Sequence, residues 1–240
     1  MKKILILGSA PDAIRASGFD KKLFDSIVAI NNAWKISPYW SHSIFPTDFP
    51  VDRRPIERSN QTLHTADEYV PIQNRYGGFL YAGGTMAFTA AYWALGKLKP
   101  DLIAFLGCDM IYEGKNTHFY GSGTADPLRK DPSLRSIEAK ANRFEYFANK
   151  MCCDVVNISD TDISRLTYQK VAVSELDSYN RSPRKLNSTV VLEALSMENS
   201  LNYFVESGKY WKETDKFDLS KIDELDSLWL SCFQNQSENT

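Results

Sequence analysis

Apolar residues along the first two thirds of the chain form short runs that alternate with longer periodic segments. The short runs have the length and composition of buried strands and cover residues 3–7, 26–30, 43–45, 101–106 and 154–158. Two longer segments, 86–98 and 133–151, have helical spacing of their apolar residues. Strands that alternate with helices predict an α/β fold, a Rossmann-like doubly wound and mostly parallel sheet with helices on both faces.

The segment 52–78 interrupts this alternation. It contains Pro55 and Pro71 among charges of both signs, and its apolar residues follow neither period. We expect the segment to leave the sheet, to run over its carboxyl edge and to act as a lid.

The composition changes after residue 172. Ser, Asn, Asp and Lys become frequent, and the apolar residues take the spacing of amphipathic helices. The last helix is expected to begin at Ser220 and Asp223, which resemble a capping box. We therefore divide the chain into a nucleotide-binding and catalytic domain, 1–172, and a helical extension, 173–240. The apolar stripe in 219–233 is expected to pack on the domain or to form an oligomer or partner contact.

Length and charge exclude several classes of protein. With 240 residues the chain can bury a core without disulfides or a metal. The formal net charge of −2 provides no basic surface for nucleic acid or an anionic membrane. The chain shows no transmembrane segment, and the apolar part of its first residues is too short for a signal peptide. The four cysteines lack zinc-ligand spacing and a secreted disulfide pattern, so we expect a cytoplasmic protein.

The loop after the predicted strand 101–106 is the first candidate for an active site. It contains Gly107, Asp109, Tyr112, His118 and Tyr120. In open parallel sheets, ligands bind beyond the carboxyl ends of the strands, where this loop begins. The loop therefore brings ionisable and hydroxyl groups to the edge at which chemistry is expected.

Each side chain of this loop has a predicted role. His118 is expected to be the general base, because an imidazole titrates near neutral pH. Tyr112 and Tyr120 can donate phenolic hydrogen bonds to a departing phosphate, and Lys115 or Arg129 can do so with charge. Asp109 is expected to orient the loop by accepting backbone N–H groups, with metal binding as the competing role.

Two glycine-containing turns are candidate anion sites. Gly8, Ser9 and Ala10 follow the first strand, and Gly83, Gly84 and Thr85 precede the helix 86–98. Glycine lets backbone N–H groups approach a phosphate, and the free N–H groups at a helix start favour negative charge. Thr85 can also cap that helix. A plain turn is the alternative at the first of these positions.

Three further polar side chains follow predicted strands. Asn31 and Asn32 come after the second strand, and an amide can bind a pyrimidine edge or ribose hydroxyls. Asp48 follows the third strand and could accept a hydrogen bond from a substrate hydroxyl, act as a base or cap a turn. All three are expected at the carboxyl edge of the sheet.

Four motifs resemble those of the bacterial sialyltransferases that use CMP-activated sialic acid, and of sialyltransferase-like proteins in bacterial and phage genomes. They are KKILILGSAP at the start, Asn31 after the second strand, GGTMAFTAAYWALG, and LGCDMIY. Their order and spacing over about 160 residues are similar to those of the family.

The resemblance implies a Rossmann-like domain with a mobile lid that displaces CMP by an acceptor hydroxyl, with inversion and without a metal. It implies nucleotide contacts at Gly8, Ser9, Asn31, Gly84 and Thr85. It also implies tyrosine donors on the leaving phosphate and a histidine base. An alternative match of the segment THFYGS to the family puts the catalytic position on Ser122, four residues after His118.

The leading hypothesis is a glycosyltransferase that transfers a sugar from a nucleotide donor, CMP-linked by the resemblance, to a glycan hydroxyl without any cofactor. A second hypothesis is a Mg²⁺-dependent diphosphate- or phosphoryl-transfer enzyme that uses Asp109 with Asp48 or Asp162. A third is a non-catalytic phage or surface-assembly protein that keeps the nucleotide cleft.

Overall fold

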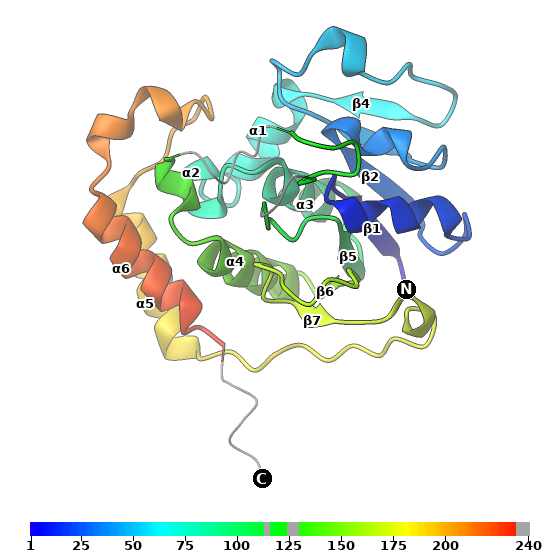
Figure 1. Ribbon diagram of the computed structural model, residues 1–240. Coiled ribbons are helices and arrows are strands. Elements are labelled where there is room, and N and C mark those ends of the chain that lie inside the picture. The colour runs from blue at the N-terminus through cyan, green and yellow to red at the C-terminus, as the bar shows by residue number, and fades with distance from the viewer. Residues whose placement is uncertain (113–115, 124–129, 234–240) are drawn as a thin grey trace.

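The fold is built around a seven-stranded, entirely parallel sheet with the order β4-β3-β2-β1-β5-β6-β7 (Figure 1). The computed structural model describes residues 1–112, 116–123 and 130–233. The strands are β1 (Lys3–Leu7), β2 (Ser26–Ile30), β3 (His42–Ile44), β4 (Thr62–His64), β5 (Leu102–Leu106), β6 (Asp154–Asn157) and β7 (Gln169–Lys170). The predicted parallel α/β fold is confirmed.

The sequence pattern missed the two outer strands. The edge strands β4 and β7 have three and two residues, and both residues of β7 are exposed. Runs this short show no measurable period, so only pairing with a neighbouring strand defines them. The five predicted strands match β1, β2, β3, β5 and β6 to within one residue at each end.

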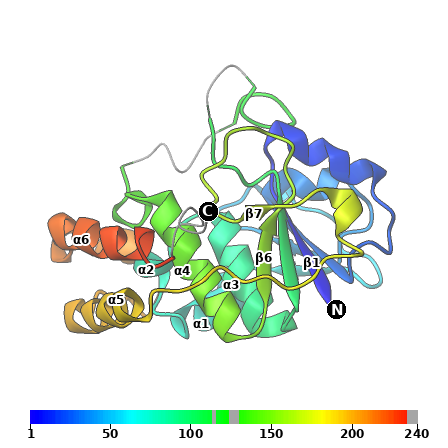
Figure 2. The ribbon, with the colours of Figure 1, turned by 90° about the horizontal axis from the view of Figure 1, so that it is seen from below.

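The α-helices pack on one face of the sheet, and the 3₁₀-helices Pro11–Gly18 and Asn31–Lys35 pack on the other (Figure 2). The α-helices are α1 (Ala66–Asn74), α2 (Phe79–Ala82), α3 (Met86–Leu98), α4 (Ile137–Lys150), α5 (Ser188–Leu201) and α6 (Leu219–Leu230). Ile4 and Ile6 of β1 belong to the core on the α-helical face, whereas Leu5 packs with the 3₁₀-helix Pro11–Gly18 on the other. This alternation follows from the two-residue period of a strand.

Helices α3 and α4 begin at side-chain caps. Thr85 accepts a hydrogen bond from the Phe88 N–H (3.2 Å), and Ser136 accepts one from the Ala139 N–H (3.1 Å). The predicted helix 133–151 is therefore divided into a 3₁₀-helix, Pro132–Leu134, and α4. The division arises because Ser136 has the extended backbone of an N-cap residue.

Part of the expected lid segment 52–78 belongs to the core. It contains β4, which pairs with β3, and α1, which packs on α3. Tyr69 and Ile72 of α1 are buried in the α-helical core. Apolar burial of α1 thus holds this part of the segment against the sheet.

The C-terminal extension packs on α4 through α5 and α6, which lie side by side (Figures 1 and 2). The apolar stripe of 219–233 is buried there, with Leu225 and Trp229 fully covered. This face is therefore covered by the chain itself. The N-cap residue of α6 is Asp218, two residues before the expected Ser220, and it accepts hydrogen bonds from the N–H groups of Ser220 and Lys221 (2.9 and 3.4 Å).

Buried ion pairs join the extension to α4. The Arg143 guanidinium donates to both carboxylate oxygens of Glu198 on α5 (2.7 Å each), and to the Tyr92 hydroxyl (2.9 Å). Lys140 pairs with Asp226 on α6 at 2.5 Å. Both pairs are almost fully buried, so each charge depends on its partner for solvation.

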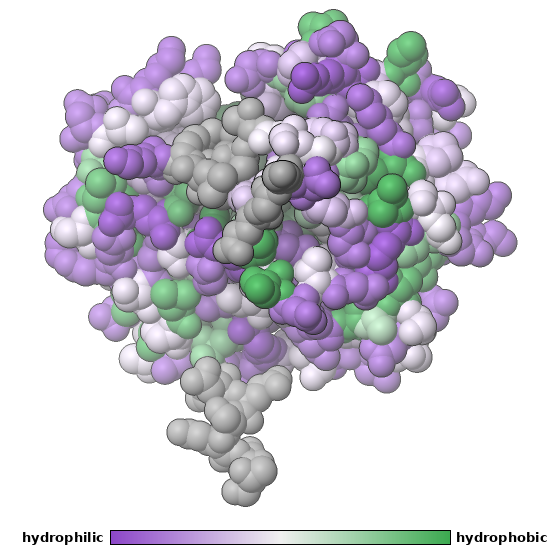
Figure 3. Space-filling model, viewed as in Figure 1, coloured by the Kyte–Doolittle hydropathy of each residue, from purple (hydrophilic) through white to green (hydrophobic). Residues whose placement is uncertain are grey.

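On the face shown in Figure 3, hydrophobic residues outside the grey atoms form small groups between hydrophilic ones. Within the described ranges, no helix combines the length and apolar character needed to cross a membrane.

Two of the three histidines, half-buried His42 on β3 and buried His64 on β4, are linked by hydrogen bonds. His42 Nδ1 lies 3.0 Å from His64 Nε2, and His64 Nδ1 lies 2.7 Å from the Glu68 carboxylate. The ring of Trp93 on α3 covers His64, with the ring centres 4.3 Å apart. Burial, and then the neighbouring His64, lowers the pKa of His42 from 6.5 to about 4.

The burial of His42 beside His64 predicts that the protein loses stability in mild acid. His42 is neutral in the folded protein but takes up a proton in the unfolded chain below pH 6.5, so the free energy of unfolding falls as the pH falls from 6.5 towards about 4. After a discount for partial exposure, we expect a loss of about 2 kcal/mol. Urea unfolding from pH 7.5 to 4.5 measures it. The H42Q variant should show a shallower pH dependence; an identical slope would contradict the prediction.

Candidate functional site

A pocket lies at the carboxyl edge of the sheet, between the segments that follow β1, β2 and β5 and the first turn of α3. It is lined by Gly8, Ser9, Ala10, Ile30, Asn31, Thr85, Met86, Ala87, Gly107, Cys108, Met110, Ile111, Tyr112, Thr117, His118 and Tyr120. The chain builds the sheet outwards from β1 to β4 and then resumes at β5 on the other side of β1. The pocket thus occupies the topological switch point, where parallel sheets bind ligands.

The glycine turn after β1 packs directly against the turn after β5. The Gly8 N–H donates to the Leu106 carbonyl (2.8 Å), and the Ala10 N–H donates to the Gly107 carbonyl (3.0 Å). A Cβ atom on Gly8 would lie 2.2 Å from the Gly107 oxygen, so only glycine fits there. Gly8 therefore permits the close approach of two protein loops, and the amides of Gly8 and Ala10 are already engaged.

The start of α3 presents a different set of donors from those predicted. Gly83 and Gly84 do not line the pocket, and the Gly84 N–H donates to Ser133 Oγ (2.9 Å). Thr85 does line it, and so do Met86 and Ala87. Met86 and Ala87 are the first two residues of α3, so their N–H groups have no partner within the helix. At this end of a helix the dipole favours an anion. The general rule for helix starts could have identified them from the sequence.

Asn31 brings a buried acceptor to the pocket. Its backbone is left-handed, with φ of 51°, and its Oδ1 atom has no hydrogen-bond partner among the described residues. Buried acceptors are normally satisfied, so this oxygen lacks the partner that such an atom usually has. Asn32 is buried beside it but does not line the pocket.

His118 lines the pocket close to two tyrosine rings. Its ring centre is 5.0 Å from that of Tyr120, with the rings stacked, and 6.0 Å from that of Tyr112. Its Nδ1 atom lies 2.8 Å from Thr117 Oγ1. Partial burial lowers the pKa of His118, so the imidazole is neutral at pH 7. When Nδ1–H donates to Thr117, Nε2 carries the lone pair of a base.

Backbone hydrogen bonds hold the His118 loop in place. The Phe119 N–H donates to the Ser9 carbonyl (2.9 Å), which joins two sites predicted separately from the sequence. A Cβ atom on Gly123 would lie 2.5 Å from His118 Nδ1. Thr117 was not predicted, and its only sequence signal is its position beside the histidine. Lys115 and Arg129 lie outside the described residues.

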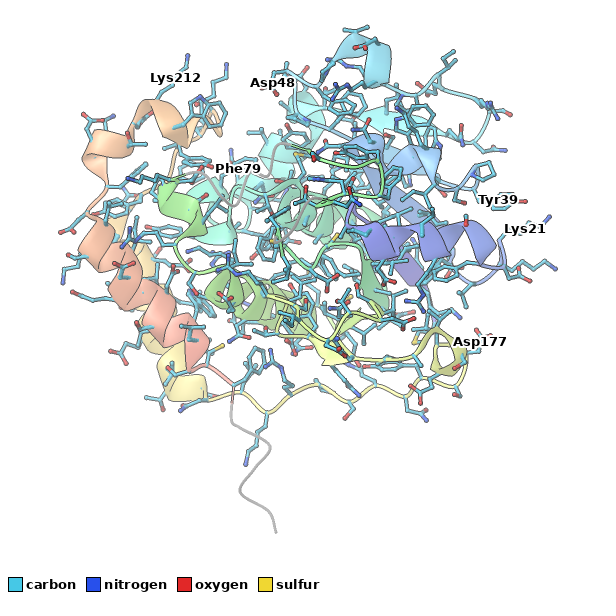
Figure 4. The ribbon with its side chains drawn as sticks, viewed as in Figure 1. Lys21, Tyr39, Asp48, Phe79, Asp177 and Lys212 are labelled. Carbon is cyan, nitrogen blue, oxygen red and sulfur yellow. The ribbon has the colours of Figure 1, made fainter. Side chains whose placement is uncertain are left out.

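Asp109 and Asp48, which the sequence predicts as site residues, do not line the pocket. Nor does Ser122, the catalytic position of the alternative match to the sialyltransferases. Asp109 is buried, and its Oδ1 atom accepts from Asn157 Nδ2 (2.9 Å), which ties the loop after β5 to the end of β6. Asp48 is exposed on the segment between β3 and β4 (Figure 4). Ser122 is exposed as well.

Acidic residues do not converge in the described part of the chain. Asp160 pairs with Arg15 at 2.9 Å, and Asp162 is exposed. Across residues 1–112, 116–123 and 130–233, no group of three or more His, Cys, Asp or Glu side chains could hold a metal ion.

Cys108 is the one cysteine among the residues that line the described pocket. It is buried, and burial raises the pKa of its thiol far above the usual value. A nucleophilic cysteine requires the thiolate form. Cys108 is therefore a packed residue of the pocket floor.

Fold and pocket together define a Rossmann-like α/β protein with a pocket at the topological switch point. Comparison of the chain with protein-family models, with curated proteins and with solved structures gave no match.

Proposed function

We propose that the protein is a glycosyltransferase that transfers a sugar from a CMP-linked donor to a glycan hydroxyl, without a metal. The observation that carries this proposal is that one pocket is lined by a histidine close to two tyrosines and by Met86 and Ala87 of the first turn of α3. The sequence resemblance to sialyltransferases supports the choice of CMP.

The proposed mechanism assigns the anion to the start of α3. The amide groups of Met86 and Ala87 bind the donor phosphate, and Tyr112 and Tyr120 donate hydrogen bonds to the phosphate as it departs. His118 Nε2 removes the proton from the acceptor hydroxyl. That oxygen attacks the anomeric carbon, the bond from this carbon to the phosphate oxygen breaks, and CMP leaves with the bonding electrons. One displacement inverts the configuration.

Asn31 is proposed to contact the nucleotide. Its unpartnered Oδ1 atom accepts a hydrogen bond from a base amine or a ribose hydroxyl. Asn31 has a left-handed backbone, which glycine also adopts. Glycine at this position therefore keeps the backbone conformation and removes the side-chain amide.

A thermal-shift panel tests the nucleotide class. CMP, CDP, UDP, GDP and ATP are each added with Mg²⁺ or with EDTA, and a ligand at 100 times its Kd stabilises the protein by about 2.7 kcal/mol. We expect CMP to raise the Tm equally with Mg²⁺ and with EDTA, and the N31G variant to show a smaller shift. Stabilisation only by a diphosphate with Mg²⁺ would favour a metal-dependent enzyme. No shift with any nucleotide would favour a non-catalytic protein.

A further inference from the structure

A hydrogen-bond network connects the C-terminal extension to the turn before α3. The Gly84 N–H donates to Ser133 Oγ (2.9 Å), and the Ser133 hydroxyl donates to Asp131 Oδ1 (2.6 Å). The hydroxyl of Tyr210, in the 3₁₀-helix Tyr210–Lys212 of the extension, donates to Asp131 Oδ2 (2.8 Å). Three segments far apart in the sequence thus meet in one network.

The Asp131 carboxylate joins the two hydroxyls of this network. A carboxylate oxygen accepts hydrogen bonds, and the hydroxyls of Ser133 and Tyr210, which also lie 3.1 Å from each other, reach its two oxygens. Ser133 Oγ also accepts the Gly84 N–H. Ser133 is fully buried and Tyr210 is 2 % exposed, so water does not compete at either hydroxyl.

Tyr210 also touches the turn itself. A Cβ atom on Gly84 would lie 2.0 Å from the Tyr210 hydroxyl oxygen and 2.8 Å from Ser133 Oγ. The Tyr210 ring stacks on Phe79 of α2, with ring centres 6.5 Å apart, and Figure 4 shows Phe79 near the part of the extension that carries Lys212. The position of the turn is therefore set by a rigid side chain of the extension.

We propose that Tyr210 is a positioning residue for the pocket. Through Asp131 and Ser133 it holds the Gly84 turn, which lies next to the pocket residue Thr85 and so determines where the Met86 and Ala87 amide groups point. The anion site at α3 is then complete only when the extension is docked. The ligand part of this proposal rests on the proposed function, because it takes those amide groups as the phosphate donors.

Removal of one hydroxyl tests the proposal. In the Y210F variant we expect hydrogen exchange of the Gly84 amide to rise at least tenfold and the Kd for CMP, measured by calorimetry, to rise about tenfold. The matched control is Y203F: the Tyr203 hydroxyl accepts from the Asp218 N–H (3.0 Å) outside the network, so Gly84 exchange and CMP affinity should stay at wild-type values.

A double-mutant cycle gives a second test. G84A introduces the clash with the Tyr210 hydroxyl, and Y210F removes one of the atoms in that clash. We expect the loss of CMP affinity in the double variant to be smaller than the product of the two single losses, because residues in contact are not additive.

The outcomes separate this inference from the proposed function. Unchanged Gly84 exchange in Y210F would overturn the inference whatever CMP does. Raised exchange with unchanged CMP affinity would overturn the link to the ligand. If the wild type binds no CMP, the proposed function fails, while the exchange measurement still decides whether Tyr210 positions the turn.

Discussion

Replacing Glu198 by alanine should lower the free energy of unfolding by about 3–5 kcal/mol, because the change leaves a buried guanidinium without its counter-charge. The Arg143 side chain is 1 % exposed and donates four hydrogen bonds: two to Glu198 and one to the Tyr76 carbonyl, at 2.7 Å each, and one to the Tyr92 hydroxyl, at 2.9 Å. Trp229 Nε1 also donates to Glu198 (2.8 Å), so the variant disturbs α6 as well as α5. Denaturant unfolding followed by circular dichroism measures the loss.

Two controls separate charge from packing. Removing both charges, in the double variant R143M/E198L, should recover part of the lost stability, because no buried charge is then left unpaired. The exposed pair of Lys221 and Glu224 on α6 is the matched surface control, and E224Q should leave the unfolding midpoint unchanged. A loss below about 1 kcal/mol in E198A would show that the pair does not hold the extension.

Replacing His118 by alanine should lower the rate of sugar transfer at least about 100-fold, which is the usual scale for loss of a general base. The KM for the donor should change little, because the proposed mechanism has the donor phosphate bind at the start of α3. Measuring kcat and KM with a CMP-linked sugar donor tests both statements. A fall of less than about threefold would remove His118 from the mechanism.

The pH profile supplies an independent check. The base must be neutral to accept a proton, and burial lowers the pKa of His118 from its usual value of 6.5. The rate should therefore hold at pH 6.5 and fall only in more acidic buffer. H42Q, which changes a histidine away from the pocket, should retain the wild-type rate. A large loss in S122A with little loss in H118A would instead support the alternative match to the sialyltransferases.

The sheet and its main helix were predictable because their signals are local. Strand β1 and helix α3 occupy the residues that their apolar periods predict. The strand β4 and the burial of α1 were not predictable, since each depends on a neighbour that is distant in the sequence. For the same reason, the sequence pattern of residues 62–74 does not show that β4 joins the sheet or that α1 packs in the core.

What the sequence by itself determined is the parallel sheet and the loop order that brings Gly8, Asn31, Thr85 and His118 to one edge, because periodicity and chain direction depend on nearby residues. Only the tertiary structure decided which residues line the pocket. The Gly84 N–H donates to Ser133, whereas Met86 and Ala87 of the next helical turn line the pocket. The Gly84–Ser133 hydrogen bond joins segments that are tens of residues apart, and the pattern of apolar residues along the sequence does not predict such a contact.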